Sequence, residues 1–328
     1  MMIGYHASHE QFSPRELSKL AQQAEMTGFQ GVLSSDHFYP WSDAQGQSGF
    51  AWSWLGAAMQ STSLPFGIVC APGQRYHPAI IAQAAATLED MFPGRFWIAL
   101  GSGQLLNEAI TGDRWPAKTL RNARLQECAG IIRRMWAGET VTHYGHVTVE
   151  QAKLYTRPHR PPPIIGAAIT AETAEWIGGW ADGLITISHP VEEMTEVLDA
   201  FRRGGGEGKP LFLKVQVSYH RDEKMARQGA YEQWRTNIFE STMLTDLRCP
   251  EQFDAAAAYV KPEDIDDHVR ISSDLAEHVG WLREYLDMGF DHIFVHNVNR
   301  DQRQFIEDFG REVLPALSGA RKPESAMA

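Results

Sequence analysis

The chain has 328 residues, 43% of them hydrophobic, and a formal net charge of −11. The length is enough for a large core, and the acidic balance argues against a nucleic-acid partner or a polybasic membrane anchor, because both need clustered basic residues. Three widely spaced cysteines without a CxxC pair support neither a disulfide framework nor a thiolate metal site, and without a signal peptide or a long apolar run we expect a cytoplasmic protein.

Eight apolar segments of strand character alternate with helical segments along the chain. The expected strands are residues 2–7, 31–35, 64–71, 95–100, 163–168, 183–188, 211–219 and 291–298. The expected helices are residues 14–28, 50–60, 78–91, 119–137, 171–181, 191–203 and 303–317. Strands that are apolar through most of their length are typical of parallel strands covered on both faces, so this α/β pattern predicts a (β/α)8 TIM barrel. A doubly wound open sheet is the alternative, but its dinucleotide signature is missing after the first strand, where the chain reads HASHEQ.

We expect one barrel domain over residues 1–318, followed by a disordered tail at 319–328. Two segments are longer than ordinary barrel loops. Residues 138–162 alternate apolar and polar side chains and predict a small hairpin. Residues 220–273, after the seventh strand, form a helical insertion, and long insertions in barrel enzymes usually build a lid or specificity region.

Chemistry in a barrel lies at the carboxyl ends of the strands. The second strand is followed there by His37, which could act as a base because its ordinary pKa lies near neutrality, or could be a structural histidine. Trp41 could stack on a ligand or belong to the core. The fifth strand ends in small residues at the start of a helix, where Thr170 could expose amides to a phosphate or simply cap the helix. The HxxH pairs lack an HExxH pattern, so we expect no metal site.

Four motifs in fixed order carry a family resemblance: DHFYPW at 36–41, RYHPAIIAQAAATL at 75–88, GSGQLLNE at 101–108 and ADG at 181–183. The chain resembles the luciferase-like oxidoreductases over nearly its whole length, and most closely their F420-dependent glucose-6-phosphate dehydrogenase branch. The resemblance implies a (β/α)8 barrel with a flavin or deazaflavin ring in its mouth, and it implies a homodimer.

The same resemblance implies roles for individual residues. His37 and Trp41 match a catalytic histidine and tryptophan, and Glu10 matches an active-site glutamate. A non-proline cis peptide is implied between Ile68 and Val69. The positions that match cofactor contacts are Asp36, Ile68, Val69, Gly103, Asn107, Ala167, Ala168, Ile169 and Thr170.

Several positions depart from the family pattern. Gln104 stands where the family usually has an acid, and a neutral amide can orient a substrate but cannot protonate it. Gln216 and Asp267 stand where two lysines hold the sugar phosphate, while Arg303 keeps a third basic position. An aspartate repels a phosphate, so we expect a small organic substrate other than glucose 6-phosphate.

The cofactor expectation leans slightly to FMN, with coenzyme F420 close behind. HASHEQFSP at 6–14 and RPPPIIGAA at 160–168 resemble a bacterial branch that has returned from F420 to FMN. We expect hydride transfer between the ring and the substrate. The alternatives are an FMN-dependent monooxygenase served by a flavin reductase, a cofactor-binding barrel without catalysis, and a barrel hydrolase.

Overall fold

The computed structural model describes residues 1–318, and the expected tail at 319–328 lies outside the described residues. Eight strands form the barrel: β1 (Met2–Ala7), β2 (Val32–Ser34), β3 (Phe66–Cys70), β4 (Phe96–Leu100), β7 (Ile164–Ala167), β8 (Gly183–Ile187), β9 (Leu211–Ser218) and β11 (His292–Asn297). Each strand pairs in parallel with the next, and β11 pairs with β1, so the sheet is closed. The predicted (β/α)8 barrel is confirmed, and the open doubly wound sheet is excluded.

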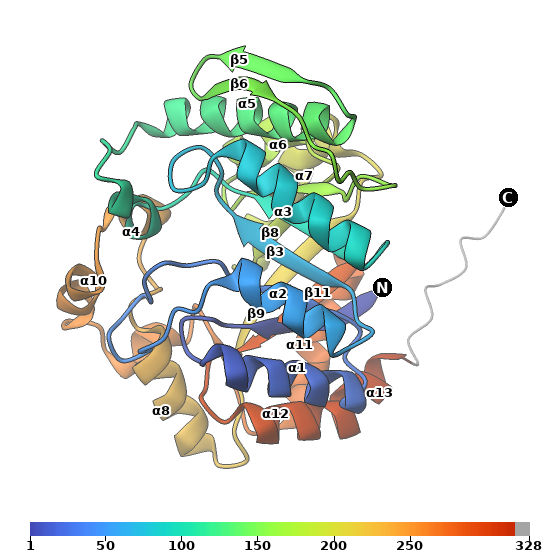
Figure 1. Cartoon of the computed structure of the whole chain (residues 1–328). Helices are drawn as coiled ribbons and strands as arrows, with labels where there is room; N and C mark the ends of the chain where they lie inside the picture. Colours follow the sequence, from blue (N-terminus) through green and yellow to red (C-terminus); the bar gives the residue numbers. More distant parts are fainter. Residues whose placement is uncertain (319–328) are drawn as a thin grey trace, which may run out of the picture.

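Helices surround the strands, as Figure 1 shows. The main ones are α1 (Pro14–Thr27), α2 (Ala51–Gln60), α3 (Pro78–Met91), α5 (Lys118–Trp136), α6 (Ala171–Gly178), α7 (Val191–Phe201), α11 (Leu275–Asp287) and α12 (Gln302–Asp308). Their ends follow local sequence signals. Ser13 Oγ accepts a hydrogen bond from the Glu16 amide at the start of α1, and Gly28 ends that helix with a φ of 99°.

Shorter elements complete the chain. They are α4 (Leu105–Glu108), η1 (Ala109–Thr111), η2 (Arg202–Gly206), η4 (Phe309–Val313) and α13 (Leu314–Ser318). The predicted hairpin is formed by β5 (Val141–Tyr144) and β6 (Thr148–Ala152), which pair in antiparallel fashion. None of the helices among residues 1–318 is long and apolar enough to cross a membrane.

The amino-terminal half of the barrel interior is filled by aromatic rings. Trp97 packs against Phe212 and Phe294, with ring centroids 4.7 and 5.6 Å apart. Gly67 lies against the same indole, and a Cβ at this position would lie 2.0 Å from the Trp97 ring. These rings form a tight plug in the amino-terminal half of the interior, whereas polar residues gather toward the carboxyl ends of the strands.

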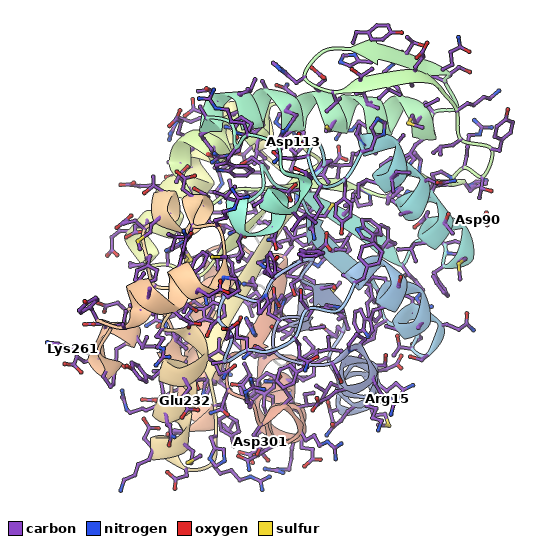
Figure 2. The ribbon with its side chains drawn as sticks, turned by 60° about the vertical axis from the view of Figure 1, so that its left-hand side comes forward. Arg15, Asp90, Asp113, Glu232, Lys261 and Asp301 are labelled. Atoms are coloured by element: carbon purple, nitrogen blue, oxygen red, sulfur yellow. The ribbon has the colours of Figure 1, made fainter. Side chains whose placement is uncertain are left out.

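The segment between β9 and α11 is helical, as the sequence predicts for residues 220–273. It contains α8 (Glu223–Trp234), α9 (Ser241–Asp246), α10 (Pro250–Ala257), η3 (Pro262–Ile265) and the short strand β10 (Arg270–Ile271). In Figure 1 it lies on one side of the barrel together with α4, and Lys261 marks its outer edge in Figure 2.

One expectation about the backbone is wrong. All peptide bonds of residues 1–318 are trans, including the bond between Ile68 and Val69. These two residues lie inside β3 and pair with Ile98 and Ala99 of β4, so the regular strand continues past them to Cys70. The Ile68 side chain is buried in the core outside the barrel, whereas Val69 faces the barrel interior.

Candidate active site

Glu10 and His37 lie side by side at the mouth of the barrel. The Glu10 side chain is buried, and its Oε2 accepts hydrogen bonds from the hydroxyls of Ser8 at 2.9 Å and Ser35 at 2.7 Å. The other oxygen, Oε1, lies 3.5 Å from His37 Nε2. Two loops that are far apart in sequence, after β1 and after β2, therefore meet at one carboxylate.

The surroundings set the charge on both groups. Burial raises the pKa of Glu10, but His37 and the hydrogen bonds from Ser35 and Ser8 outweigh it and lower this pKa to about 2. Burial lowers the pKa of His37, and the Glu10 carboxylate opposes that effect. Near neutral pH the pair is thus an ionised carboxylate beside an uncharged imidazole, which can accept a proton.

Trp41 borders this pair and is held by the insertion. Its ring centroid lies 5.1 Å from that of His37 and 5.3 Å from that of Phe253 in α10, which it meets edge to face. The neighbouring Ser42 hydroxyl donates to Asp254 Oδ1 at 2.7 Å. The insertion after β9 therefore fixes the position of the tryptophan, which gives this segment a direct part in shaping the site.

Asp36 belongs to a buried network beside the pair. Its carboxylate accepts hydrogen bonds from Arg75 Nη2 at 3.1 Å and from the Tyr76 hydroxyl at 3.0 Å. Arg75 also lies between Asp36 and Glu108, with its Nε 3.6 Å from Glu108 Oε1 and its amide donating to Oε2 at 2.7 Å. Burial raises the pKa of Asp36, and Arg75 counteracts it. Asp36 thus already holds the loop, and its expected contact with a cofactor stays a prediction.

A surface of small residues lies where β4 ends, two strands along the barrel from β2. Gly103 follows β4 with a φ of 83°, and a Cβ there would lie 3.3 Å from both Ala71 Cβ and Glu108 Cγ. A Cβ on Gly101 would approach Ala167 Cβ to 3.6 Å. Gly101 and Gly103 together form a wall without side chains where β4 ends, and such a wall would accommodate the planar ring of a flavin or deazaflavin.

The remaining expected cofactor and acid positions lie around this wall. Asn107 Oδ1 accepts a hydrogen bond from the Phe38 amide at 2.8 Å, which joins the loops after β2 and β4. Gln104 precedes α4, and its side chain makes no hydrogen bond to any of residues 1–318. Thr170 caps α6, because its Oγ1 accepts from the Thr173 amide at 3.4 Å. Ala168 is buried next to the half-buried Ile169.

The residues expected to bind substrate are not brought together. Gln216 points into the barrel, where its Oε1 accepts a hydrogen bond of 2.6 Å from the Ser188 hydroxyl. Arg303 is exposed on α12, in the outer helical layer, and its carbonyl accepts a hydrogen bond from Gln23 of α1. Asp267 lies in the insertion.

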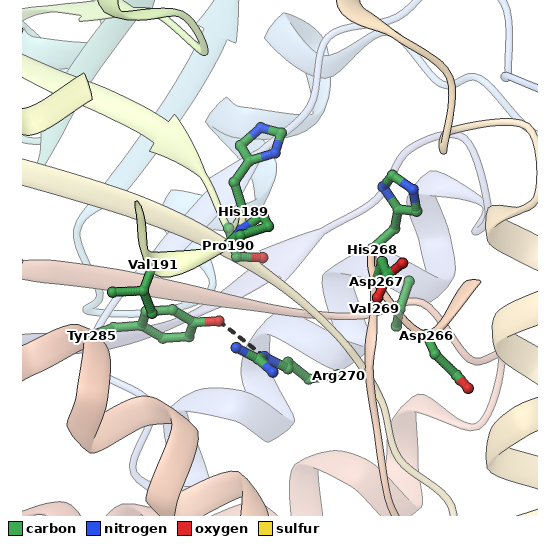
Figure 3. Close-up of a pocket in the computed structure, with 10 residues that line it drawn as sticks. His189, Pro190, Val191, Asp266, Asp267, His268, Val269, Arg270 and Tyr285 are labelled. Atoms are coloured by element: carbon green, nitrogen blue, oxygen red, sulfur yellow. Dashed lines mark hydrogen bonds between the residues drawn. The ribbon is translucent and has the colours of Figure 1, made fainter. Parts of the chain in front are cut away.

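Asp267 lines a pocket of about 310 Å³ between the β8–α7 loop and the end of the insertion. Figure 3 shows His189 and His268 on either side of it, with Arg270 Nε hydrogen-bonded to the Tyr285 hydroxyl at 3.4 Å. Within the described chain, no three His, Cys, Asp or Glu side chains are arranged to hold a metal ion.

One polar residue of the barrel interior was missed by the sequence analysis. Lys214 of β9 faces inward between Phe212 and Gln216, because side chains alternate between the two faces of a strand. Alternation of Phe212, Lys214 and Gln216 with the apolar Leu213 and Val215 was the signal that could have identified it.

The chain matches the sequence model of the luciferase-like monooxygenase family over residues 1–292. The protein belongs to this family. Two relatives of this luciferase-like protein are named F420-dependent glucose-6-phosphate dehydrogenase. The one from Nakamurella multipartita is 37% identical and covers 96% of both chains, and the one from Beutenbergia cavernae is 35% identical over 99% of this chain and all of its own.

A solved structure resembles this luciferase-like barrel closely. It is an F420-dependent secondary alcohol dehydrogenase in complex with an F420–acetone adduct, 28% identical, with a TM-score of 0.89 over 96% of this chain and 98% of that one. The expected family, fold and oxidoreductase or monooxygenase class are confirmed. The matches support F420 as a cofactor and lend no specific support to FMN, toward which the sequence leaned.

Proposed function

We propose that this luciferase-like protein is an F420-dependent oxidoreductase that transfers a hydride between the deazaflavin and a small organic substrate. The observation that carries the proposal is the pairing of His37 with the ionised Glu10, 3.5 Å apart, at the barrel mouth that also holds the small-residue wall at Gly101 and Gly103. The similarity to an F420-dependent alcohol dehydrogenase supports the choice of cofactor.

The residues of the chain supply the proton chemistry and the enclosure. A bound deazaflavin would contribute a two-electron hydride acceptor or donor against the wall formed by Gly101 and Gly103. His37 takes the proton of a substrate hydroxyl at Nδ1, which has no hydrogen-bond partner among residues 1–318. Its Nε2 carries a hydrogen toward Glu10, and that carboxylate stabilises the imidazolium that results. Trp41 packs beside His37 and would shield it from water, which would strengthen the electrostatic interaction between His37 and Glu10.

We further propose that the substrate is not glucose 6-phosphate, although this sugar phosphate appears in the names of the relatives. A phosphate monoester carries nearly two negative charges near neutral pH. Gln216 is uncharged and already bonded to Ser188, while the nearby pocket contains two carboxylates, Asp266 and Asp267, against one cation, Arg270. These charges favour a substrate without a phosphate group.

The second candidate function is an FMN-dependent monooxygenase that receives reduced flavin from a reductase. It is favoured by HASHEQFSP and RPPPIIGAA, the two stretches that resemble the FMN-using branch. In either case we propose a cytoplasmic homodimer acting on a small molecule.

The experiment uses the purified protein loaded with F420 and a panel of alcohols and sugar phosphates, following the loss of oxidised deazaflavin absorbance. We expect turnover with members of the alcohol panel, and His37→Ala should reduce it at least about tenfold while cofactor affinity stays within about twofold. His146→Ala, which removes an exposed histidine of the hairpin, is the control. Unchanged turnover in His37→Ala would remove this residue from the mechanism.

A further inference from the structure

Among residues 1–318, the ammonium group of Lys214 has no hydrogen-bond or ion-pair partner. Its Nζ lies within 4 Å of no carboxylate in this part of the chain, and it faces the Trp234 ring, whose centroid is 5.4 Å away. Two other lysines do have hydrogen-bond partners. Lys118 donates to the Ser102 hydroxyl at 3.2 Å, and Lys209 donates to the Gly178 carbonyl at 2.6 Å. Lys214 is therefore a cation left unpaired inside the barrel.

The groups that face Lys214 do not neutralise it. They are Glu10 and three histidines, His6, His37 and His296. Burial lowers the pKa of each of these histidines, so all three are uncharged near neutral pH. Among residues 1–318, Glu10 is the one carboxylate whose charge stabilises the Lys214 ammonium. Its Oε2 already accepts hydrogen bonds from Ser8 and Ser35, and its Oε1 lies beside His37.

The neighbouring His296 offers no negative charge to Lys214. His296 Nε2 lies 2.9 Å from Gln11 Oε1, and the Gln11 amide nitrogen donates to Gln233 Oε1 and to the Val298 carbonyl. Since both amide hydrogens of Gln11 are used, its oxygen must accept, and His296 carries its proton on Nε2. This network is neutral and offers Lys214 no negative charge, and His296 Nδ1 is buried without a hydrogen-bond partner among residues 1–318.

The place of Lys214 in the barrel points toward the substrate. In the closed order β1-β2-β3-β4-β7-β8-β9-β11, strand β9 lies four strands from β3 in either direction. Lys214 therefore lies on the opposite side of the barrel from β3, and β1 and β2, which lead into the loops with Glu10 and His37, stand between β9 and β3 in this order. The small-residue wall for the cofactor ring is on the far side, so the space next to Lys214 belongs to the molecule that reacts with the ring.

Lys214 is half-buried, and an ammonium without an ion-pair partner in such a place is costly, because a charge that is partly removed from water needs a partner. Burial lowers the pKa of Lys214 to about 8, which leaves the group mostly protonated near neutral pH. A carboxylate brought in by the substrate would restore the missing pair. One cation matches one negative charge, whereas a phosphate dianion would remain half compensated.

We propose that Lys214 binds a carboxylate of the substrate, so that the substrate class is small hydroxy acids and the corresponding oxo acids. The assignment rests on the proposed oxidoreductase function, because it identifies which molecule occupies the space between Lys214 and His37. It adds a specificity-determining residue on β9 to the catalytic pair on the loops after β1 and β2.

The first arm of the test measures binding without turnover. Wild-type protein and Lys214→Met, both loaded with F420, are titrated calorimetrically with propionate, lactate, inorganic phosphate and isopropanol. We expect the carboxylates to bind the wild type at least about tenfold more tightly than Lys214→Met, and isopropanol to bind both equally. Lys214→Arg should recover part of the carboxylate affinity. Lys153→Met, in the exposed stretch after β6, is the matched control for loss of a positive charge.

The second arm measures turnover with lactate, β-hydroxybutyrate and γ-hydroxybutyrate, which place the hydroxyl at increasing distances from the carboxylate. For the acids that react, Lys214→Met should raise KM about tenfold or more, while KM for isopropanol should change by less than about twofold. Equal carboxylate binding by wild type and Lys214→Met, no carboxylate binding by the wild type, or tighter binding of phosphate would each overturn the proposal. Loss of all F420-dependent turnover with carboxylate binding intact would instead refute the proposed function alone.

Discussion

Replacing Glu10 with Gln isolates the electrostatic part of the proposed site. Gln keeps an oxygen that can accept from Ser8 and Ser35 but removes the charge 3.5 Å from His37 Nε2. At this distance a pair of unit charges interacts by about 1.2 kcal/mol in water and about 4.7 kcal/mol at an effective dielectric constant of about 20. One pKa unit corresponds to about 1.4 kcal/mol, so the imidazolium should lose roughly one to three pKa units of stabilisation.

The sign of the change is fixed by the charge. Removal of a neighbouring negative charge disfavours the imidazolium, so the pKa of His37 should fall further below its ordinary value. The acidic limb of the pH–rate profile should move to lower pH, and the plateau of kcat should drop about 10- to 100-fold because the weaker base accepts the proton less readily.

Two measurements check this prediction. NMR titration of the labelled imidazole in the cofactor-free protein reports the pKa of His37, and F420-dependent turnover across pH reports the rate. The control is Glu193→Gln, since Glu193 pairs with His189 at 3.7 Å on the exposed surface and should alter turnover little. A His37 pKa that shifts by less than about 0.3 units, or a kcat within about twofold of wild type, would refute the electrostatic role of Glu10.

Three further predictions concern packing and pH. Gly67→Ala should destabilise the barrel by about 1–3 kcal/mol or more in urea unfolding, because its Cβ would lie 2.0 Å from the confined Trp97 ring; wild-type stability would contradict the tight plug. The buried Asp308 carboxylate accepts hydrogen bonds from Tyr219 and from two arginines. These bonds outweigh the effect of burial and lower the pKa of Asp308 from 3.8 to about 2. The ionised carboxylate contributes about 1–2 kcal/mol to the free energy of unfolding, after allowance for the exposed arginines. This contribution is complete above pH 4 and is lost as the pH falls through 2, so Asp308→Asn should abolish that part of the acid dependence of unfolding. For hydroxy acids, KM should rise about tenfold per pH unit above the Lys214 pKa of about 8, with no such rise for isopropanol; equal pH profiles would exclude the ammonium as the anchor.

The sequence predicts the frame of the molecule well because the signals are local. Ser13 and Gly28 mark the ends of α1, and the helix expected at residues 78–91 is α3, Pro78–Met91. The eight apolar segments predict the barrel strands within two residues or so at most ends, since parallel strands covered on both faces must be apolar.

The same apolarity hides which face of a strand points inward. Ile68 and Val69 are both apolar, yet one packs outside the barrel and the other inside it. The family resemblance also led to a wrong cis peptide here, because pairing with β4 continues through both residues. The sequence did not identify Lys214, because its proposed role depends on the lack of a hydrogen-bond or ion-pair partner. That lack can be recognised only in the folded barrel.

Long-range partners were equally invisible in the sequence. The Glu10–His37 pair joins two loops, and Trp41 is held by Phe253 from an insertion more than 200 residues away in the chain. Spacing along the chain does not determine such contacts. Arg303, by contrast, sits on the exposed side of α12, although it follows the last barrel strand closely in sequence.

The central claim, that the barrel mouth is built for a deazaflavin used in hydride transfer, is tested most directly by equilibrium titration of the cofactor-free protein with F420 and FMN in parallel, following tryptophan fluorescence. We predict that F420 quenches the fluorescence with a Kd at least about tenfold lower than that of FMN. Tighter binding of FMN would contradict the claim and favour the monooxygenase, and binding of neither cofactor would contradict both.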